Sequence, residues 1–323
     1  MQQMPLLLED YLNYMETIKG LSPNTVKEYF YDLRTFFRFL KIRYRLVKSN
    51  IPFDEIHIHD VDADLIKKIT IQDLHAYISY IDKIKGNGNF SKSRKIASLK
   101  SFFNYLYSIV NLIDKNPADK LEFPKTDKRH PTYLTLGECE RLLKAVLENK
   151  NELYRKRDYA IIILFLNCGL RLSELSSINI SKIKDDTLTV IGKGNKERTV
   201  YLNKACVEAI NDYLSVRPKD AIDEDALFLS KRKRRMSNRA IQHMIDKYLK
   251  KAGFDTSIYS THKLRHTAAT LMYKYGNVDI RALQEILGHK NVSTTQIYTH
   301  IDNEHLREAV KSNPLANINI KNR

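Results

Sequence analysis

Apolar residues recur at helical spacing through the first third of the chain, and this pattern restricts its fold more than any other feature. Ser22 and Pro23 are typical of a helix start. The apolar side chains that follow at three- and four-residue spacing are Val26, Tyr29, Phe30, Leu33, Phe36, Phe37 and Leu40. Similar patterns predict helices over about 8–18, 70–81 and 96–106. Aromatic side chains in such stripes mostly form core, so the sequence predicts a helical bundle here.

Residues 41–68 interrupt the predicted bundle. Asp60, Asp62 and Asp64 resemble the first ligands of a calcium loop, but the glycine expected at the sixth position is missing. Ile71 stands at the twelfth position, where a calcium loop has glutamate. We therefore interpret the three aspartates as part of a solvated loop. Residues 57–59 alternate as in a short strand, and the two histidines among them are a weak indication of metal.

A polar segment bounded by prolines, FPKTDKRHP at residues 123–131, predicts a domain boundary. We expect a helical domain over residues 1–123, a linker over 124–131, a second domain over 132–302 and a C-terminal helix and tail over 303–323. In the second domain, residues 187–191 and 198–202 alternate as the strands of a β-hairpin. Helices are expected at about 158–166, 204–215, 237–251, 262–275, 279–287 and 294–301. The predicted fold class is mainly α with a small β-hairpin, that is, α+β.

The charge of the chain indicates a polyanionic partner. Lys and Arg number 54 against 38 Asp and Glu, which gives a net charge of +16, and nucleic acid is the simplest partner for such an excess. No apolar run approaches the roughly 20 residues of a membrane span, and the N-terminus lacks the basic region of a secretory signal. The three cysteines lie far apart in sequence and suggest no disulfide. These features predict a cytoplasmic protein without a membrane partner.

Two groups of basic residues are candidate DNA contacts. The candidates on the predicted helices of the first domain are Lys92, Arg94, Lys95 and Lys100. A basic run before a helix of the second domain adds Lys231, Arg232, Lys233, Arg234, Arg235 and Arg239. Phosphate contacts by such residues give affinity without sequence preference. The alternative for each group is a solvated basic surface.

Four segments of the second domain concentrate groups that bind phosphate. Arg171 follows a buried helix and a glycine, although an ion pair with Glu174 would also explain it. The remaining candidates are His262 and Arg265 on one predicted helix face, His289, Tyr298, and Lys193 at the hairpin tip.

Together these residue types suit attack on a phosphodiester without a metal or cofactor. Two arginines can neutralise the transition state, and a lysine or histidine can protonate the leaving alkoxide. A tyrosine can serve as nucleophile and store the phosphodiester bond covalently, but its ordinary pKa of about 10 requires a base or cationic surroundings.

The strings GLRLSEL, IGKGNKERTVYL, HKLRHTAATLMY and LGHKNVSTTQIYTH closely resemble tyrosine recombinases of the integrase family, in particular the Xer type. The strings LSPNTVKEY, SRKIASLKSFFNYLY and NPADKLEFPK resemble the helical, SAM-like core-binding domain of the same family. The resemblance implies that Tyr298 attacks the scissile phosphate, leaving a 3′-phosphotyrosyl bond and a free 5′-hydroxyl.

The resemblance also assigns roles to the other candidates. It implies that Arg171 and Arg265 clamp the phosphate and that His289 hydrogen-bonds it, while Lys193 protonates the leaving oxygen and His262 moves the proton of Tyr298. His266 matches no core position of the family, and we interpret it as structural.

For the whole chain the resemblance implies a C-shaped clamp around duplex DNA and a homo- or hetero-tetramer that exchanges strands through a four-way junction. A second recombinase, and possibly a DNA translocase, would be partners. The 41–68 insertion and Thr261, where many relatives carry proline, depart from the family pattern. Chromosome dimer resolution and mobile-element integration remain open. Other classes are a type IB topoisomerase, or a non-catalytic DNA-binding accessory protein.

Overall fold

The computed structural model describes residues 4–48, 50–83, 86, 88–125, 132–192, 196–276, 278–289 and 291–301. The chain divides between residues 128 and 129 into two compact units, each of which has its own hydrophobic core. No helix within the described ranges is long and apolar enough to cross a membrane.

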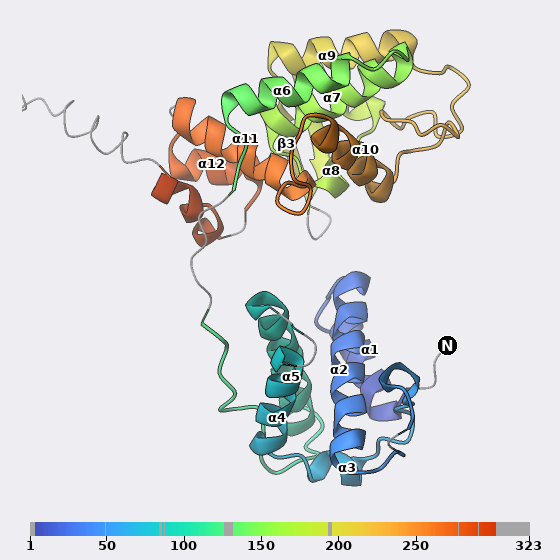
Figure 1. Ribbon diagram of the computed structural model, residues 1–323, viewed down its shortest axis with the longest axis vertical. Coiled ribbons are helices and arrows are strands. Elements are labelled where there is room, and N and C mark those ends of the chain that lie inside the picture. The colour runs from blue at the N-terminus through green and yellow to red at the C-terminus, as the bar shows by residue number, and fades with distance from the viewer. Residues whose placement is uncertain are drawn as a thin grey trace, which may run out of the picture. The chain divides into compact units, whose positions relative to one another are not determined.

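The first unit is helical, as the periodicity predicts (Figure 1). Its helices are α1 (Leu6–Thr17), α2 (Pro23–Arg43), α3 (Ala63–Lys67), α4 (Ile71–Lys83) and α5 (Asn89–Ser108). The Ser22 hydroxyl accepts from the Thr25 amide at 3.3 Å, which confirms the predicted N-cap of α2. Phe36, Phe37 and Phe102 are buried and meet other rings edge to face, so the aromatic stripes form the core.

The strand expected at residues 57–59 is wrong, because those residues lie in irregular structure that follows a short 3-10 helix, η1 (Phe53–Glu55). Two side chains of α2 form hydrogen bonds to carbonyls that a strand would use for pairing. Arg38 donates to Ile56 O at 2.9 Å, and Lys41 donates to His57 O at 3.0 Å. Among the described residues, no group of three His, Cys, Asp or Glu side chains could hold a metal ion.

The aspartates of the same segment have structural roles. Asp60 pairs with Lys41 at 2.7 Å, and Asp62 caps α3 by accepting from the Leu65 amide at 2.8 Å. The calcium-loop resemblance therefore reflects a helix cap and an ion pair.

The second unit surrounds one buried helix, α7 (Glu152–Cys168). The other helices are α6 (Leu136–Leu147), α8 (Leu172–Ser176), α9 (Lys204–Val216), α10 (Asn238–Lys251), α11 (Thr261–Tyr275) and α12 (Ile280–Leu287). Helices α6, α9 and α11 pack against α7. Thr135 and Glu138 form a capping box that begins α6.

The sheet of the second unit is antiparallel in the order β1-β2-β3. Strands β2 (Thr187–Ile191) and β3 (Glu197–Tyr201) form the predicted hairpin, with Leu188 opposite Val200 on the buried face. Strand β1 (Ile183–Lys184) was not predicted because two residues show no alternation.

The helix expected at residues 294–301 is instead a pair of 3-10 helices, η3 (Val292–Thr294) and η4 (Gln296–Ile301). The backbone amides of Thr295 and Tyr298 donate to the carbonyls three residues earlier, at 2.7 and 3.1 Å. This tighter winding is usual for short segments.

Packing of α7 against α9 brings together two cysteines that are far apart in sequence. The sulfurs of Cys168 and Cys206 lie 3.7 Å apart as free, buried thiols. No local pattern indicates this proximity, because it depends on the way the two helices pack.

Candidate active site

Glu174, a buried carboxylate on α8, organises the site. Its side chain accepts from the Arg171 guanidinium at 2.7 Å and from the Arg171 amide at 2.8 Å. Arg198, on β3, donates to a carboxylate oxygen at 2.9 Å, and Arg265, on α11, lies 3.8 Å from the same oxygen. One carboxylate therefore lies beside three arginines, which come from the start of α8, from β3 and from α11. The sequence raised the Arg171–Glu174 pair as an alternative to a phosphate contact, and the pair is present.

The ends of two helices provide the remaining acceptors for the arginines. Arg265 donates to Gly169 O and Leu287 O, both at 2.6 Å, and Arg171 donates to Gly288 O at 2.7 Å. These carbonyls end α7 and α12, where the helix dipole favours cations. A guanidinium carries five N–H donors, and the hydrogen bonds to described residues use two on Arg171 and two on Arg265. Both arginines therefore retain donors for a ligand.

Gly169 and Gly288 allow this close approach. Both have positive φ, +57° and +63°, as left-handed C-caps of α7 and α12. A Cβ on Gly288 would lie 2.9 Å from the Arg198 side chain, and one on Gly169 would lie 2.8 Å from Leu287. A larger residue at position 288 would push against Arg198 in the arginine cluster, and one at position 169 would push against Leu287.

Arg198 was not among the predicted site residues. Its side chain donates to Ile286 O at 2.6 Å as well as to Glu174, and it is largely buried. The signal available was a basic residue on a strand with a buried face, directly after the predicted hairpin tip. That pattern did not separate Arg198 from the exposed charges of the hairpin.

Tyr298, on η4, lies against α11 in a buried position with only 1% of its surface exposed. Its hydroxyl lies 2.7 Å from Nδ1 of His266, and Nε2 of His266 lies 3.0 Å from Nε2 of His262. The interpretation of His266 as merely structural did not anticipate these contacts. The i, i+4 spacing of the two histidines on a helix was the available signal.

His289 follows α12 and is fixed from both sides. Its Nδ1 lies 2.9 Å from the Thr295 hydroxyl, and its carbonyl accepts from the Gln284 side chain at 2.9 Å. Because Nδ1 has a partner within the protein, Nε2 is the atom that could contact a phosphate.

Burial and neighbouring charge shift the pKa values of the site. Burial raises the pKa of Tyr298 to about 12, which the charge of Arg265 partly opposes. Burial, and then the charge of Arg265, lowers the pKa of His289 to about 4. Burial alone would raise the pKa of Glu174, but hydrogen bonds from Arg198 and Arg171 outweigh it and hold that pKa below its ordinary value.

Lys193 and the predicted C-terminal helix at 303–311 lie outside the described residues. Of the predicted site residues, the structure brings Arg171 and Arg265 together around Glu174. It connects Tyr298 to His262 through His266, which was not predicted for the site.

The basic run of the second unit separates into anchors and exposed charges. Arg235 donates to Ile178 O at 2.9 Å and to the Asn179 side chain at 2.6 Å, and Lys233 pairs with Asp220. These two side chains are therefore held within the protein. The exposed members of the run are Lys231, Arg232, Arg234 and Arg239. Ser237 caps α10 immediately after the run.

The basic candidates of the first unit all have partners within the protein. Lys95 is buried and pairs with Asp32 at 2.7 Å, and Arg94 pairs with the same carboxylate at 2.9 Å. Lys92 pairs with Asp82 at 2.6 Å. In this conformation the Lys95 ammonium is not available to a phosphate.

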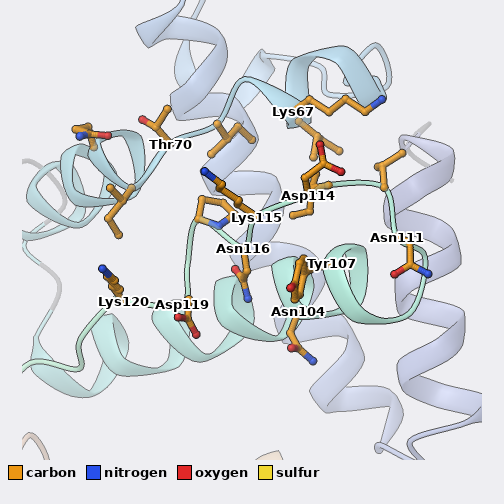
Figure 2. A pocket seen from close by; sticks show the side chains of 17 residues that line it. Lys67, Thr70, Asn104, Tyr107, Asn111, Asp114, Lys115, Asn116, Asp119 and Lys120 are labelled. Carbon is orange, nitrogen blue, oxygen red and sulfur yellow. The ribbon is translucent and has the colours of Figure 1, made fainter.

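A hollow of about 1100 Å³ lies in the first unit, between the segment around Thr70 and the chain after α5 (Figure 2). Lys100 fixes one wall by donating to Ala118 O and Asp119 O at 2.9 and 2.7 Å. The lining of the hollow contains lysines together with Asp114 and Asp119, so the hollow lacks the uniform positive charge of a phosphate groove.

Family models match both parts of the chain. The phage integrase family matches residues 132–305, and the N-terminal SAM-like domain of phage integrases matches residues 8–50. The chain therefore belongs to the phage integrase family, and its fold is a SAM-like helical domain followed by an integrase catalytic domain. Within that family it is a tyrosine recombinase of the Xer type, a class of enzymes that cut and rejoin DNA at specific sites.

Similar proteins support the narrower class. Tyrosine recombinase XerC of Caldanaerobacter subterraneus subsp. tengcongensis is 58% identical over 313 residues, which is 97% of this chain and 88% of the relative. Tyrosine recombinase XerC of Thermodesulfovibrio yellowstonii is 35% identical over 318 residues, 96% of each chain.

Solved structures share the fold. The XerH site-specific recombinase bound to a palindromic difH substrate superposes with a TM-score of 0.68 at 20% identity, covering 96% of this chain and 97% of the other. The Tn1549 transposon integrase in complex with a circular-intermediate DNA gives a TM-score of 0.69 at 20% identity, covering 90% and 94%.

Proposed function

We propose that this recombinase cleaves duplex DNA with Tyr298 as its nucleophile. The observation that carries the proposal is the placement of the Tyr298 hydroxyl against α11, the helix that also carries Arg265. Attack by the phenol oxygen forms a phosphotyrosyl bond to the 3′ side of the break and releases a 5′-hydroxyl. Religation is the reverse reaction, with the 5′-hydroxyl as nucleophile, so the strands are rejoined without an external energy source.

The arginine cluster suits the charge of the transition state. Arg171 and Arg265 would bind the non-bridging oxygens through the donors that the described residues leave free. Glu174 and the helix-end carbonyls hold the guanidiniums in place before DNA arrives, so little reorganisation accompanies the reaction. His289 would donate from Nε2 to the same phosphate, and Lys193 would protonate the leaving 5′-oxygen.

Because Tyr298 is buried, the scissile phosphate must reach its hydroxyl, beside His266, before attack. DNA binding is the natural trigger, because it brings the phosphate to the remaining donors of Arg171 and Arg265.

We place the reaction on a recombination site in duplex DNA in the cytoplasm, within a homo- or hetero-tetramer. The net charge of +16 and the exposed basic residues of the second unit support DNA as the partner. A lambda integrase tetramer bound to a Holliday junction shares this fold. The proposal includes the C-shaped clamp of the family, a possible second recombinase and DNA translocase, and either chromosome dimer resolution or mobile-element exchange as the cellular role.

The test uses a library of nicked duplex substrates from which religation is prevented. Wild-type protein should form a denaturation-resistant adduct with some members, and Tyr298→Phe should bind the same duplexes without forming it. An adduct that persists in Tyr298→Phe would show that another residue is the nucleophile. Relaxation of supercoiled DNA without paired sites would favour a type IB topoisomerase-like activity, and binding without any adduct would favour an accessory role.

A further inference from the structure

We infer that His266 is a catalytic residue that takes the proton of Tyr298 directly and passes it to His262. The inference rests on the proposed role of Tyr298 as nucleophile. The resemblance to the family gives proton transfer to His262 and leaves His266 without a role. The structure places His266 between the two, with its ring nitrogens 2.7 Å from the Tyr298 hydroxyl and 3.0 Å from His262 Nε2.

Burial makes such a route necessary. Tyr298 packs among Ala269, Leu283 and Leu287 and is 1% exposed, so its hydroxyl proton has no direct path to water. His266 is half-buried and His262 is exposed, which gives a path of increasing exposure along one face of α11. The two imidazole rings stand edge to face with centroids 4.5 Å apart.

The need of the Tyr298 hydroxyl for an acceptor sets the direction of the hydrogen bonds from Tyr298 through His266 to His262. Among the described residues, His266 is the hydrogen-bond partner found for the Tyr298 hydroxyl. A buried hydroxyl proton needs an acceptor, so Tyr298 donates to Nδ1 of neutral His266. That tautomer carries its hydrogen on Nε2 and donates it to Nε2 of His262.

The transfer balances atom by atom. As the phenol oxygen bonds to phosphorus, its proton moves to His266 Nδ1, and the proton on His266 Nε2 moves to His262 Nε2. His262 becomes a cation at the solvent-exposed end and releases a proton to water. The P–O bond to the 5′-oxygen breaks, and that oxygen takes the proton that the proposed mechanism assigns to Lys193, which gives the 5′-hydroxyl. Religation runs the same steps backwards and returns the proton to Tyr298.

The electrostatics agree with a carrier that never stays charged. Burial, and then the charge of His262, lowers the pKa of His266 to about 4. A proton that arrives from Tyr298 is therefore passed on. Partial loss of hydration, and then the charge of Arg265, also lowers the pKa of His262, and its exposed edge lets water take the proton.

The test separates positioning from proton transfer with two substitutions. In His266→Asn the amide oxygen can still accept from Tyr298 but cannot relay a proton, and in His266→Phe both functions are lost. His243→Asn, at an exposed histidine on α10, is the matched control. Each variant is assayed in a single turnover on the nicked duplex that forms the wild-type adduct, at saturating DNA, after its DNA affinity and circular dichroism are measured.

We expect His266→Asn to cleave about 100-fold more slowly than wild type, the usual size of a lost general base, with unchanged DNA affinity. His266→Phe should be at least as slow, and His243→Asn should match wild type. A fluorinated tyrosine at position 298, whose phenol is more acidic, should restore much of the rate in His266→Asn and change the wild-type rate little. A merely structural defect would not respond to phenol acidity.

Several outcomes would overturn the relay. They are a His266→Asn rate close to wild type, no recovery with the fluorinated tyrosine, or faster cleavage by His266→Phe, which would show that the bond only restrains the hydroxyl. These results differ from failure of the proposed function, which appears as an adduct that persists in Tyr298→Phe.

Discussion

Each unit of the molecule contains a buried carboxylate surrounded by basic side chains, and the two clusters differ in what the cations can still do. In the first unit Asp32 pairs with Arg94 and Lys95. In the second unit Glu174 pairs with Arg171 and Arg198, and Arg265 lies close by. Both carboxylates are almost completely buried, yet only the second cluster lies beside a candidate nucleophile.

The balance between burial and charge separates the two clusters. Burial raises the pKa of Asp32 more than its ion pairs with Lys95 and Arg94 lower it. At Glu174 the hydrogen bonds from Arg198 and Arg171 outweigh burial and keep the pKa low. The helix ends supply further acceptors to the arginines of the second unit. A charged cluster of this kind is suited to hold cations for a ligand, whereas the Asp32 cluster joins two helices.

Glu174→Gln should produce the largest effect, because it leaves Arg171, Arg198 and Arg265 without a buried counter-charge. We expect adduct formation to slow by on the order of 100-fold at saturating DNA, as the arginines lose their preset positions. The free energy of unfolding should fall by about 3 kcal/mol, the cost typical of a broken buried pair. Single-turnover cleavage and urea unfolding measure the two effects, and a wild-type cleavage rate would remove the cluster from the mechanism.

Asp32→Asn is the matched change in the first unit. It should lower the free energy of unfolding by about 3 kcal/mol, because Lys95 loses its buried partner. Cleavage by the folded, DNA-saturated protein should stay close to wild type. A loss of cleavage as large as that of Glu174→Gln would mean that the two clusters do not differ in function.

The smallest effect concerns DNA affinity and distinguishes exposed from paired cations. Alanine at Lys231, Arg232, Arg234 and Arg239 together should reduce the slope of log affinity against log salt by about 0.9 for each phosphate that the protein no longer neutralises. Lys95→Met should leave the slope unchanged, because that ammonium is already paired with Asp32. Fluorescence anisotropy over a series of salt concentrations measures both, and an unchanged slope in the fourfold variant would place the DNA surface elsewhere.

The sequence by itself determined most of the helices, the hairpin and the candidate residues for the chemistry. Local signals suffice for these: apolar side chains at helical spacing, the Thr135–Glu138 capping box, and short motifs in the order of the family. The same signals could not decide which cations are free. Lys95 and Arg232 look alike in sequence, but one is buried beside Asp32 and the other is exposed.

Only the tertiary structure decided the contacts between distant segments. Arg198 joins the arginine cluster around Glu174 because β3 packs near the end of α12, and His266 meets Tyr298 because η4 lies against α11. These contacts span 24 to 88 residues of chain. Spacing within one helix or strand carries no information about such distances, since they depend on how whole elements bury their apolar faces against one another.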